Sequence, residues 1–282
     1  MRIDAHQHYW RLDRGDYDWL TPELGVLHRD YLPAQLEPLL RTAGVCATVL
    51  VQAAASEAET RFLAQLAHAT PTVAGVVGWF DMEDVEAPSH LDALRADCDG
   101  MLKGVRPMVQ DIPDDQWLGR DALDPAFDAI IQAGLAFDAL VLPRHLDALL
   151  VRLERHPRLR TVIDHCAKPD IARGRFSDWA RALHRLAEHP GVHCKLSGLL
   201  TQMAPGQGVE ALRPYVAKVL EIFGPRRILW GSDWPVLGLR AEYGDWLVCT
   251  RALLTGLDHD EQDAIFGGNA ARFYRLSMPD AA

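Results

Sequence analysis

The chain has 282 residues, of which 49% are hydrophobic and 24% are charged, a composition that is typical of a globular protein and argues against extended disorder. The formal net charge of −10 disfavours nucleic acid and anionic membranes as partners, and no run of 18 apolar residues predicts a membrane span. The N-terminus carries charged residues and histidines where a secretion signal has an apolar core, and the five cysteines form no C-x-x-C pair. We therefore expect a cytoplasmic protein with reduced thiols.

Short apolar runs rich in β-branched residues recur along the chain, mostly at spacings of about 25 to 35 residues, the length of one strand–helix unit. We expect eight strands, within residues 2–8, 47–53, 72–81, 102–108, 135–141, 160–166, 192–198 and 227–235. Amphipathic helical stripes lie between them, as at Leu36, Leu39, Leu40 and Ala43. The alternation predicts a single-domain (β/α)₈ TIM barrel over residues 1–282. The alternative is a doubly wound open sheet, which usually has a Gly-rich turn after its first strand, and none follows His8.

The longest irregular segment, residues 9–31, follows the first predicted strand and is rich in Tyr and Trp. In a barrel this position lies at the carboxyl ends of the strands, where binding sites form. The segment is therefore a candidate wall or lid of a site, and a packed surface loop is the alternative.

Catalytic groups of barrel enzymes lie at the carboxyl ends of the strands, and polar residues concentrate there in this chain. They are His6 and His8, Gln52, Trp79 and Asp81, Arg106, Asp164 and His165, Lys195 and Ser197, and Asp233. A purely structural barrel needs no such set at one end, so the pattern predicts an active site.

His6 and His8 lie two residues apart, so a regular strand presents both on one face together with Asp4. They are candidates for binding a metal ion or a substrate, and polar residues at a strand end are the alternative. The same alternation separates Asp164 from His165, so we expect one of the two to line the barrel.

The motifs extend over nearly the whole chain: "DAHQHYW", "GVRPMVQDIPDDQWL", "VIDHCAKP", "CKLSGL", "WGSDWPV" and "GGNAARFY". In this order they resemble the amidohydrolase superfamily, and within it the sugar-lactone hydrolases, a subgroup that includes L-fuconolactonases and L-rhamnonolactonases. The resemblance implies a small-molecule substrate, a sugar lactone, that is opened to its hydroxy acid.

For such a reaction Asp233 is the candidate general base that activates water, and His165 is the candidate donor to the developing oxyanion, with His6 or His8 as alternatives. Arg106 offers a fork of donors for the substrate. Gln52, Trp79 and Trp234 are the candidate binding walls, and core packing is the alternative for the two tryptophans.

The two-metal pattern of the superfamily includes a histidine on the fifth strand, and residues 135–141 contain none. The remaining options are one divalent ion, zinc or manganese, on His6, His8 and Asp233, and catalysis without a metal. A metal-dependent decarboxylase or amidase of the same superfamily, or a non-catalytic barrel that binds a small molecule, are the alternative functions. The sequence leaves the sugar and the oligomeric state open.

Overall fold

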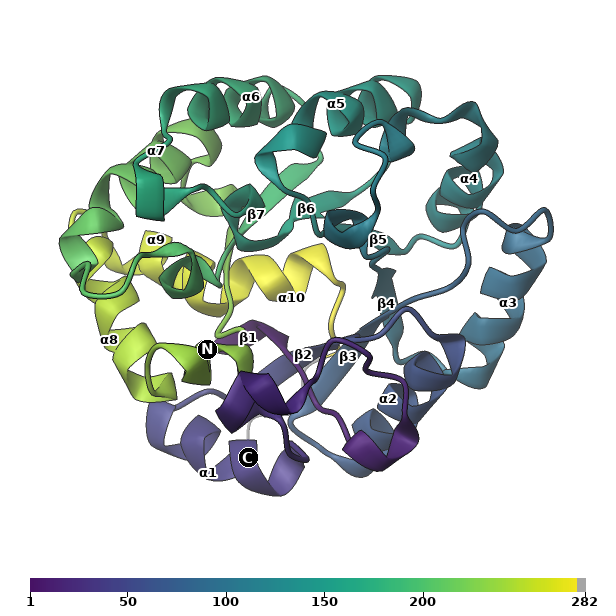
Figure 1. Cartoon of the computed structure of the whole chain (residues 1–282), viewed down its shortest axis with the longest axis horizontal. Helices are drawn as coiled ribbons and strands as arrows, with labels where there is room; N and C mark the ends of the chain where they lie inside the picture. Colours follow the sequence, from purple (N-terminus) through teal and green to yellow (C-terminus); the bar gives the residue numbers. More distant parts are fainter. Residues whose placement is uncertain (278–282) are drawn as a thin grey trace.

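The computed structural model describes residues 1–277, which form eight parallel strands surrounded by helices (Figure 1). The strands pair in chain order. They are β1 (Ile3–Gln7), β2 (Ala47–Val51), β3 (Val73–Gly78), β4 (Leu102–Val105), β5 (Ala136–Ala139), β6 (Thr161–Ile163), β7 (Val192–Leu196) and β8 (Ile228–Trp230). The expected (β/α)₈ barrel is therefore confirmed.

A helix follows each strand and packs on the outside of the barrel, as the outer ring in Figure 1 shows. These helices are α1 (Pro33–Ala43), α2 (Glu57–Ala69), α3 (Ala87–Asp97), α4 (Asp124–Gln132), α5 (Leu146–Arg155), α6 (Ser177–Ala187), α7 (Arg213–Phe223) and α8 (Tyr243–Leu253). Two short helices, α9 (His259–Asp263) and α10 (Asn269–Phe273), end the described chain. No helix within residues 1–277 is long and apolar enough to cross a membrane.

The barrel closes between β1 and the segment that follows β8. Gln7 forms a parallel bridge with Trp234, the His8 N–H donates to the Trp234 carbonyl at 2.7 Å, and the Asp233 N–H donates to the His6 carbonyl at 2.8 Å. This closure excludes the doubly wound open sheet. It also brings the first strand against the residues after the last one.

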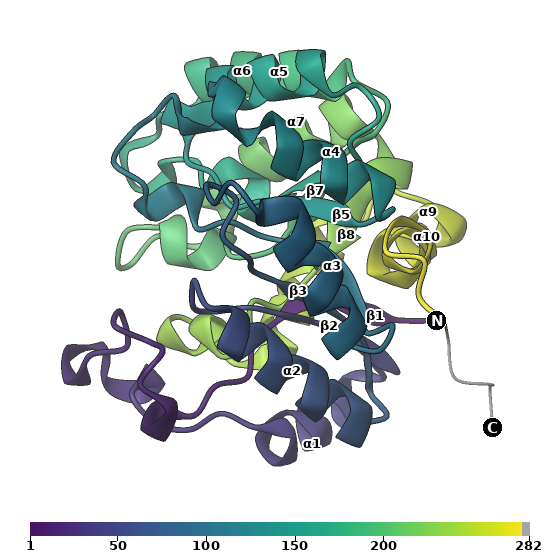
Figure 2. The same cartoon turned by 90° about the vertical axis from the view of Figure 1, so that its right-hand side faces the viewer.

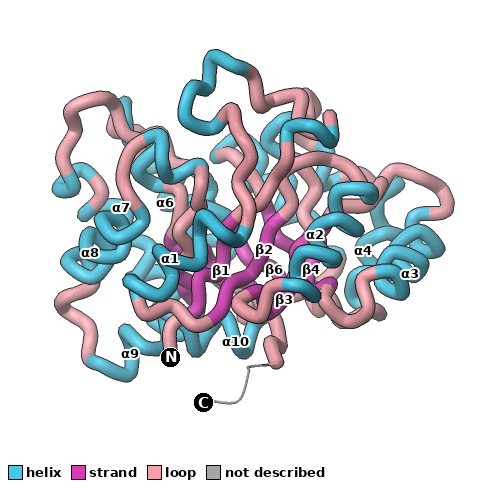
Figure 3. Tube along the Cα trace, turned by 90° about the horizontal axis from the view of Figure 1, so that it is seen from below, coloured by secondary structure: helices cyan, strands magenta, loops and turns pink. Residues whose placement is uncertain are grey.

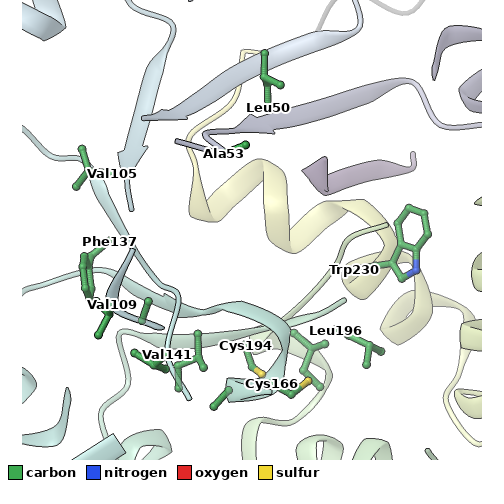
Figure 4. Close-up of a cluster of buried hydrophobic side chains, with 14 of the residues drawn as sticks. Leu50, Ala53, Val105, Val109, Phe137, Val141, Cys166, Cys194, Leu196 and Trp230 are labelled. Carbon is green, nitrogen blue, oxygen red and sulfur yellow. The ribbon is translucent and has the colours of Figure 1, made fainter. Parts of the chain in front are cut away.

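Two apolar layers hold the barrel together. Figure 4 shows part of the outer layer, in which Leu50, Phe137, Leu196 and other strand residues pack among the helices. The inner layer fills the barrel with small and branched side chains from the strands and is completed by Ala270, Phe273 and Tyr274. Figure 2 shows α10 at the end of the barrel where the N-terminus lies, so this helix covers the end opposite the strand tips.

All eight predicted runs contain a strand, but the strands are shorter than the runs. For example, β6 ends at Ile163, whereas the apolar run extends to Cys166. Figure 3 shows the short strands inside a larger shell of helices and loops. Most of the polar residues that end the runs therefore belong to the loops that leave the barrel, whereas His6 and Lys195 lie within β1 and β7.

Candidate active site

A cavity of about 230 Å³ lies at the carboxyl ends of the strands. Its lining contains the polar side chains of His8, Arg106, Gln110, Asp111, His165, Lys168 and Asp233, and the less polar Trp19, Ala53, Met108, Leu140 and Val236. A hollow of about 780 Å³ shares Lys168 with this cavity, and another of about 580 Å³ lies elsewhere; neither contains a histidine or Asp233 in its lining. The meeting of His8, His165 and Asp233 at the carboxyl ends of the strands therefore identifies the smaller cavity as the candidate active site.

His6, His8 and Asp233 meet beneath this cavity. The Nε2 atoms of His6 and His8 are 3.2 Å apart, and the Asp233 Oδ1 lies 3.4 Å from the His8 Nε2 and 3.7 Å from the His6 Nε2. The His8 Nδ1–H donates to the Val51 carbonyl at 2.8 Å, which turns the His8 Nε2 toward Asp233. All three side chains are at least nine-tenths buried.

An irregularity in β1 determines which of its side chains enter this cluster. The pairing register with β2 shifts between Asp4 and Gln7, and the Asp4 carboxylate accepts the His6 N–H at 3.1 Å. The same carboxylate accepts hydrogen bonds from the Ser232 N–H and from the hydroxyl of Tyr243, the first residue of α8, so the Asp4 side chain lies against α8. Asp4 is therefore separated from His6 and His8, contrary to the expectation from simple alternation.

A left-handed turn positions His165. Residues 165 to 168 all have positive φ, with values of 52°, 53°, 59° and 47°, and none of them is glycine. The turn brings both residues that follow β6 into the site: His165 Nε2 lies 3.8 Å from Asp233 Oδ1, and Asp164 Oδ1 lies 3.4 Å from His6 Nδ1. The expectation that one of the two lines the barrel is wrong, because the strand ends before either residue.

Gly198 and Ser197 hold the His165 ring from the side of β7. The Ser197 hydroxyl is 2.8 Å from His165 Nδ1. A Cβ on Gly198 would lie 2.5 Å from the same nitrogen, far inside normal contact, and Gly198 has a positive φ of 63°. Only glycine allows this close approach without displacing the imidazole.

Arg106 lines the cavity, but protein atoms occupy its donors. The Nε and Nη2 groups donate to the side-chain oxygen of Gln52 at 3.3 and 2.8 Å, and Nη2 also donates to the Gln52 carbonyl. Nη1 lies 3.2 Å from Asp164 Oδ2 and 3.4 Å from His6 Nε2. Four of the five guanidinium N–H groups therefore donate to oxygen atoms of Gln52 and Asp164, and the fifth lies against the His6 ring.

Of the expected wall residues, Gln52 is fully buried and holds Arg106 in place. Trp79 and Trp234 are absent from the cavity lining. Trp234 packs against Tyr9 and Tyr31, with ring centroids 6.1 and 5.1 Å apart, which is the core-packing alternative. The tryptophan that lines the cavity is Trp19.

Trp19 comes from the irregular segment 9–31, which was identified from the sequence as a candidate wall. Its indole N–H donates to the Ala53 carbonyl at 2.8 Å, and 38% of the residue is exposed. Lys168 and Gln110 also line the cavity and were not singled out from the sequence. Both lie within the quoted motifs, but no strand pattern marks them.

Beneath the histidines is a buried network of charges. The Lys195 ammonium lies 2.5 Å from Asp138 Oδ2, 3.1 Å from Asp164 Oδ1 and 3.1 Å from His6 Nδ1. The Tyr274 hydroxyl donates to Asp138 at 2.6 Å. Asp138 occupies the middle of β5, where the two-metal pattern has a histidine on this strand, and its carboxylate already binds Lys195.

Burial and neighbouring charges set the protonation states. Burial lowers the pKa of His165 to about 4, and burial together with the Lys195 charge holds the pKa of His6 well below its usual range. Burial alone would raise the pKa of Asp233. The neighbouring His165, His8 and His6 have the larger combined effect, so the pKa of Asp233 is lowered. At neutral pH the site therefore combines an ionised carboxylate with neutral His6 and His165 side chains.

The cluster fits one divalent cation. Tetrahedral zinc with ligand bonds of about 2.0–2.1 Å needs donor atoms about 3.3 Å apart, and the His6, His8 and Asp233 atoms are 3.2 to 3.7 Å apart. His6, His165 and Asp233 also each offer a ligand atom within 4.8 Å of the others, so His165 could take the place of His8 in such a site. Imidazole and carboxylate are suitable ligands for zinc or manganese.

Comparison with known proteins places the chain in a family. Residues 3–276 match the family model described as amidohydrolase. The chain belongs to the amidohydrolase family. It is 47% identical to an L-fucono-1,5-lactonase of Burkholderia ambifaria over 99% of this chain and 97% of that protein. It is 38% identical to an L-fucono-1,5-lactonase of Burkholderia multivorans, over 99% and 97% of the two chains.

Among solved structures, an amidohydrolase from Burkholderia multivorans with bound zinc superimposes with a TM-score of 0.92. The two share 34% sequence identity, and the match covers 98% of this chain and 100% of that one. A zinc-bound relative of this similarity is consistent with the metal-compatible cluster in this chain.

Proposed function

We propose that this chain hydrolyses a sugar lactone to the corresponding hydroxy acid, a reaction of carbohydrate metabolism, with L-fucono-1,5-lactone as the first candidate substrate. One observation carries the proposal: an ionised carboxylate and three imidazoles meet at one small cavity, in a chain 47% identical over nearly its whole length to an L-fucono-1,5-lactonase. The free state of all five cysteines supports a cytoplasmic location for the reaction.

The size of the cavity supports a small substrate. Sites for drug-sized ligands span about 300–1,000 Å³, and this cavity measures about 230 Å³. It suits a single ring, with Trp19 as an apolar wall on one side. A sugar lactone matches it because such a ring has an apolar face and several hydroxyls.

In the proposed reaction Asp233 accepts a proton from water, whose oxygen attacks the lactone carbonyl. With the Ser197 hydroxyl donating to His165 Nδ1, the proton of the neutral ring resides on Nε2, where it donates to the developing oxyanion. Cleavage of the ring ester bond then releases an alkoxide, which takes up the proton from Asp233. Arg106 keeps Gln52, Asp164 and His6 in place through the contacts described above.

His6, His8 and Asp233 would hold a divalent ion, and such an ion would supply Lewis-acid charge to the reaction. The protein groups alone offer a base and an oxyanion donor, so the proposal covers catalysis with or without this ion.

A panel of sugar lactones tests the function. Purified protein is incubated with L-fucono-1,5-lactone, L-rhamnono-lactone and further aldonolactones in weak buffer with a pH indicator. Hydrolysis releases one proton per turnover, and the acid product is identified by mass spectrometry. Acid release no faster than the spontaneous rate with every lactone would refute the proposal.

A further inference from the structure

Three polar side chains form a continuous strip along one wall of the cavity. The Lys168 ammonium donates to Gln110 Oε1 at 2.6 Å, and the Gln110 side-chain amide donates to Asp111 Oδ2 at 3.2 Å. All three residues line the cavity together with His165 and Asp233. The strip presents a cation, an amide and a carboxylate to the same space.

Lys168 retains donors for a ligand. Its ammonium has three N–H groups, and among residues 1–277 the structure gives it one hydrogen-bond acceptor, Gln110. Arg106 differs, because Gln52, Asp164 and His6 occupy its donors. Of the two cations that line the cavity, Lys168 therefore has more donors free for a substrate.

The backbone around the strip is firmly held. The left-handed turn places Lys168 beside His165, and the Lys168 N–H donates to the His165 carbonyl at 2.9 Å. Gln110 donates from its backbone to the Leu140 carbonyl and accepts from the Arg144 side chain, both at 3.0 Å. The strip is thus built between two loops and joined at the Lys168–Gln110 bond.

We infer that Lys168, Gln110 and Asp111 recognise the ring hydroxyls of the substrate and select hydroxylated lactones over unsubstituted ones. The inference rests on the proposed function. Each sugar hydroxyl both donates and accepts, so the Lys168 ammonium bonds one hydroxyl oxygen while the Asp111 carboxylate accepts from a neighbouring hydroxyl. Trp19, Met108 and Leu140 supply the less polar lining against which the ring packs.

The test compares wild type with Lys168→Met on two lactones of equal ring size. L-Fucono-1,5-lactone carries hydroxyls, and δ-valerolactone has none and is measured as a substrate, or as a competitive inhibitor where turnover is too slow. Methionine keeps the side-chain length without the charge. We expect the preference for the hydroxylated lactone, a ratio of kcat/KM values or of dissociation constants, to fall at least tenfold.

Lys218→Met is the matched control, since Lys218 lies on α7 and pairs with Glu221 at 2.5 Å. Its preference should equal that of wild type. Asp111→Asn is the second strip variant and should also lower the preference, and thermal melts establish that each variant is folded. If both strip variants keep the wild-type preference, the inference is overturned while the proposed function stands. If wild type opens no lactone, the proposed function fails and the inference falls with it.

Discussion

The Asp233 side chain is the centre of the proposed chemistry, and its backbone is adapted to the position. Asp233 has a φ of 60°, in the left-handed region that Asp and Asn tolerate better than most residues. Substitution by asparagine therefore changes the chemistry while keeping the shape and the backbone preference.

We predict that Asp233→Asn lowers kcat for the lactone by about 100-fold or more, because an amide cannot accept the proton of the attacking water. Steady-state kinetics provide the measurement, and a thermal melt close to that of wild type shows that the fold is intact. A folded variant with near-normal kcat would remove Asp233 from the role of base.

The number of free ligand side chains determines how many metal ions the site can hold. We predict at most one zinc or manganese ion per chain by elemental analysis of purified protein. The reason is that β5 offers Asp138, whose carboxylate is bound by Lys195 and Tyr274, so a second ion lacks ligands. Two tightly bound ions per chain would contradict this assignment and indicate a binuclear site.

Gly198 provides a test of how precisely His165 must be placed. We predict that Gly198→Ala reduces kcat at least tenfold, because the new Cβ would displace the His165 ring from Ser197. Gly206→Ala is the control, since Gly206 also has a positive φ, of 83°, but has no atom within 4 Å of its ideal Cβ. Both variants should lose about 1–2 kcal/mol of stability from backbone strain, and equal activities of the two would contradict the steric argument.

At the scale of elements, the sequence predicts the barrel well because its strands are buried on both faces. Such strands consist of continuous apolar runs, and the runs alternate with helical stripes, so both the number and the order of the strands are recognisable. The ends of the strands are less predictable. Nothing in residues 165 to 168 marks a left-handed turn, because none of them is glycine.

The residues that line the cavity are likewise only partly predictable from the sequence. His6, His8, Arg106, His165 and Asp233 are predictable because each follows an apolar run at the catalytic end of a barrel. Other residues depend on contacts between distant loops. Lys168 meets Gln110 across 58 positions, and Trp19 meets Ala53 across 34, so no local pattern identifies them.

A buried glutamate on α2 holds the loop between β2 and α2, and its titration should make the stability of the protein depend on pH. Glu59, on α2, is fully buried, and its carboxylate accepts the backbone N–H groups of Ala53 and Ala54 at 2.9 to 3.1 Å. Ala53 also accepts the Trp19 indole N–H, so Glu59 supports the wall of the cavity. Burial raises the pKa of Glu59 from 4.5 to about 7.

A folded-state pKa above the unfolded value means that Glu59 stabilises the fold fully below about pH 4.5 and loses this contribution as the pH rises to about 7. The unfolding free energy of wild type should therefore fall between pH 5 and pH 8. Glutamine at position 59 stays neutral, so we predict that this fall is smaller in Glu59→Gln by on the order of 1–3 kcal/mol. Urea denaturation at the two pH values measures it. Glu57→Gln is the control, since Glu57 pairs with Arg61 on the surface of α2. A pH dependence equal to that of wild type would exclude Glu59 as the titrating group.

At the scale of the whole molecule, a chain of buried polar contacts connects the two ends of the barrel. It runs from Tyr274, which follows α10 at the closed end, through Asp138 and Lys195 to His6 beneath the cavity. Asp164 joins it from the turn that follows β6 and connects Lys195 with Arg106. The C-terminal helix is thereby linked to the cluster at the opposite end.

Lys195 is the cation that this network requires, because both Asp138 and Asp164 are fully buried within 3.1 Å of its ammonium. We predict that Lys195→Met lowers the unfolding free energy by about 3–5 kcal/mol, the cost of leaving buried charges unpaired. Adding Asp138→Asn should then cost less than it does in the wild-type background, with a coupling of at least about 1 kcal/mol in a double-mutant cycle. Urea denaturation of the four proteins measures this coupling. Strictly additive effects would show that Lys195 and Asp138 stabilise the barrel independently, in which case the network would not act as a unit.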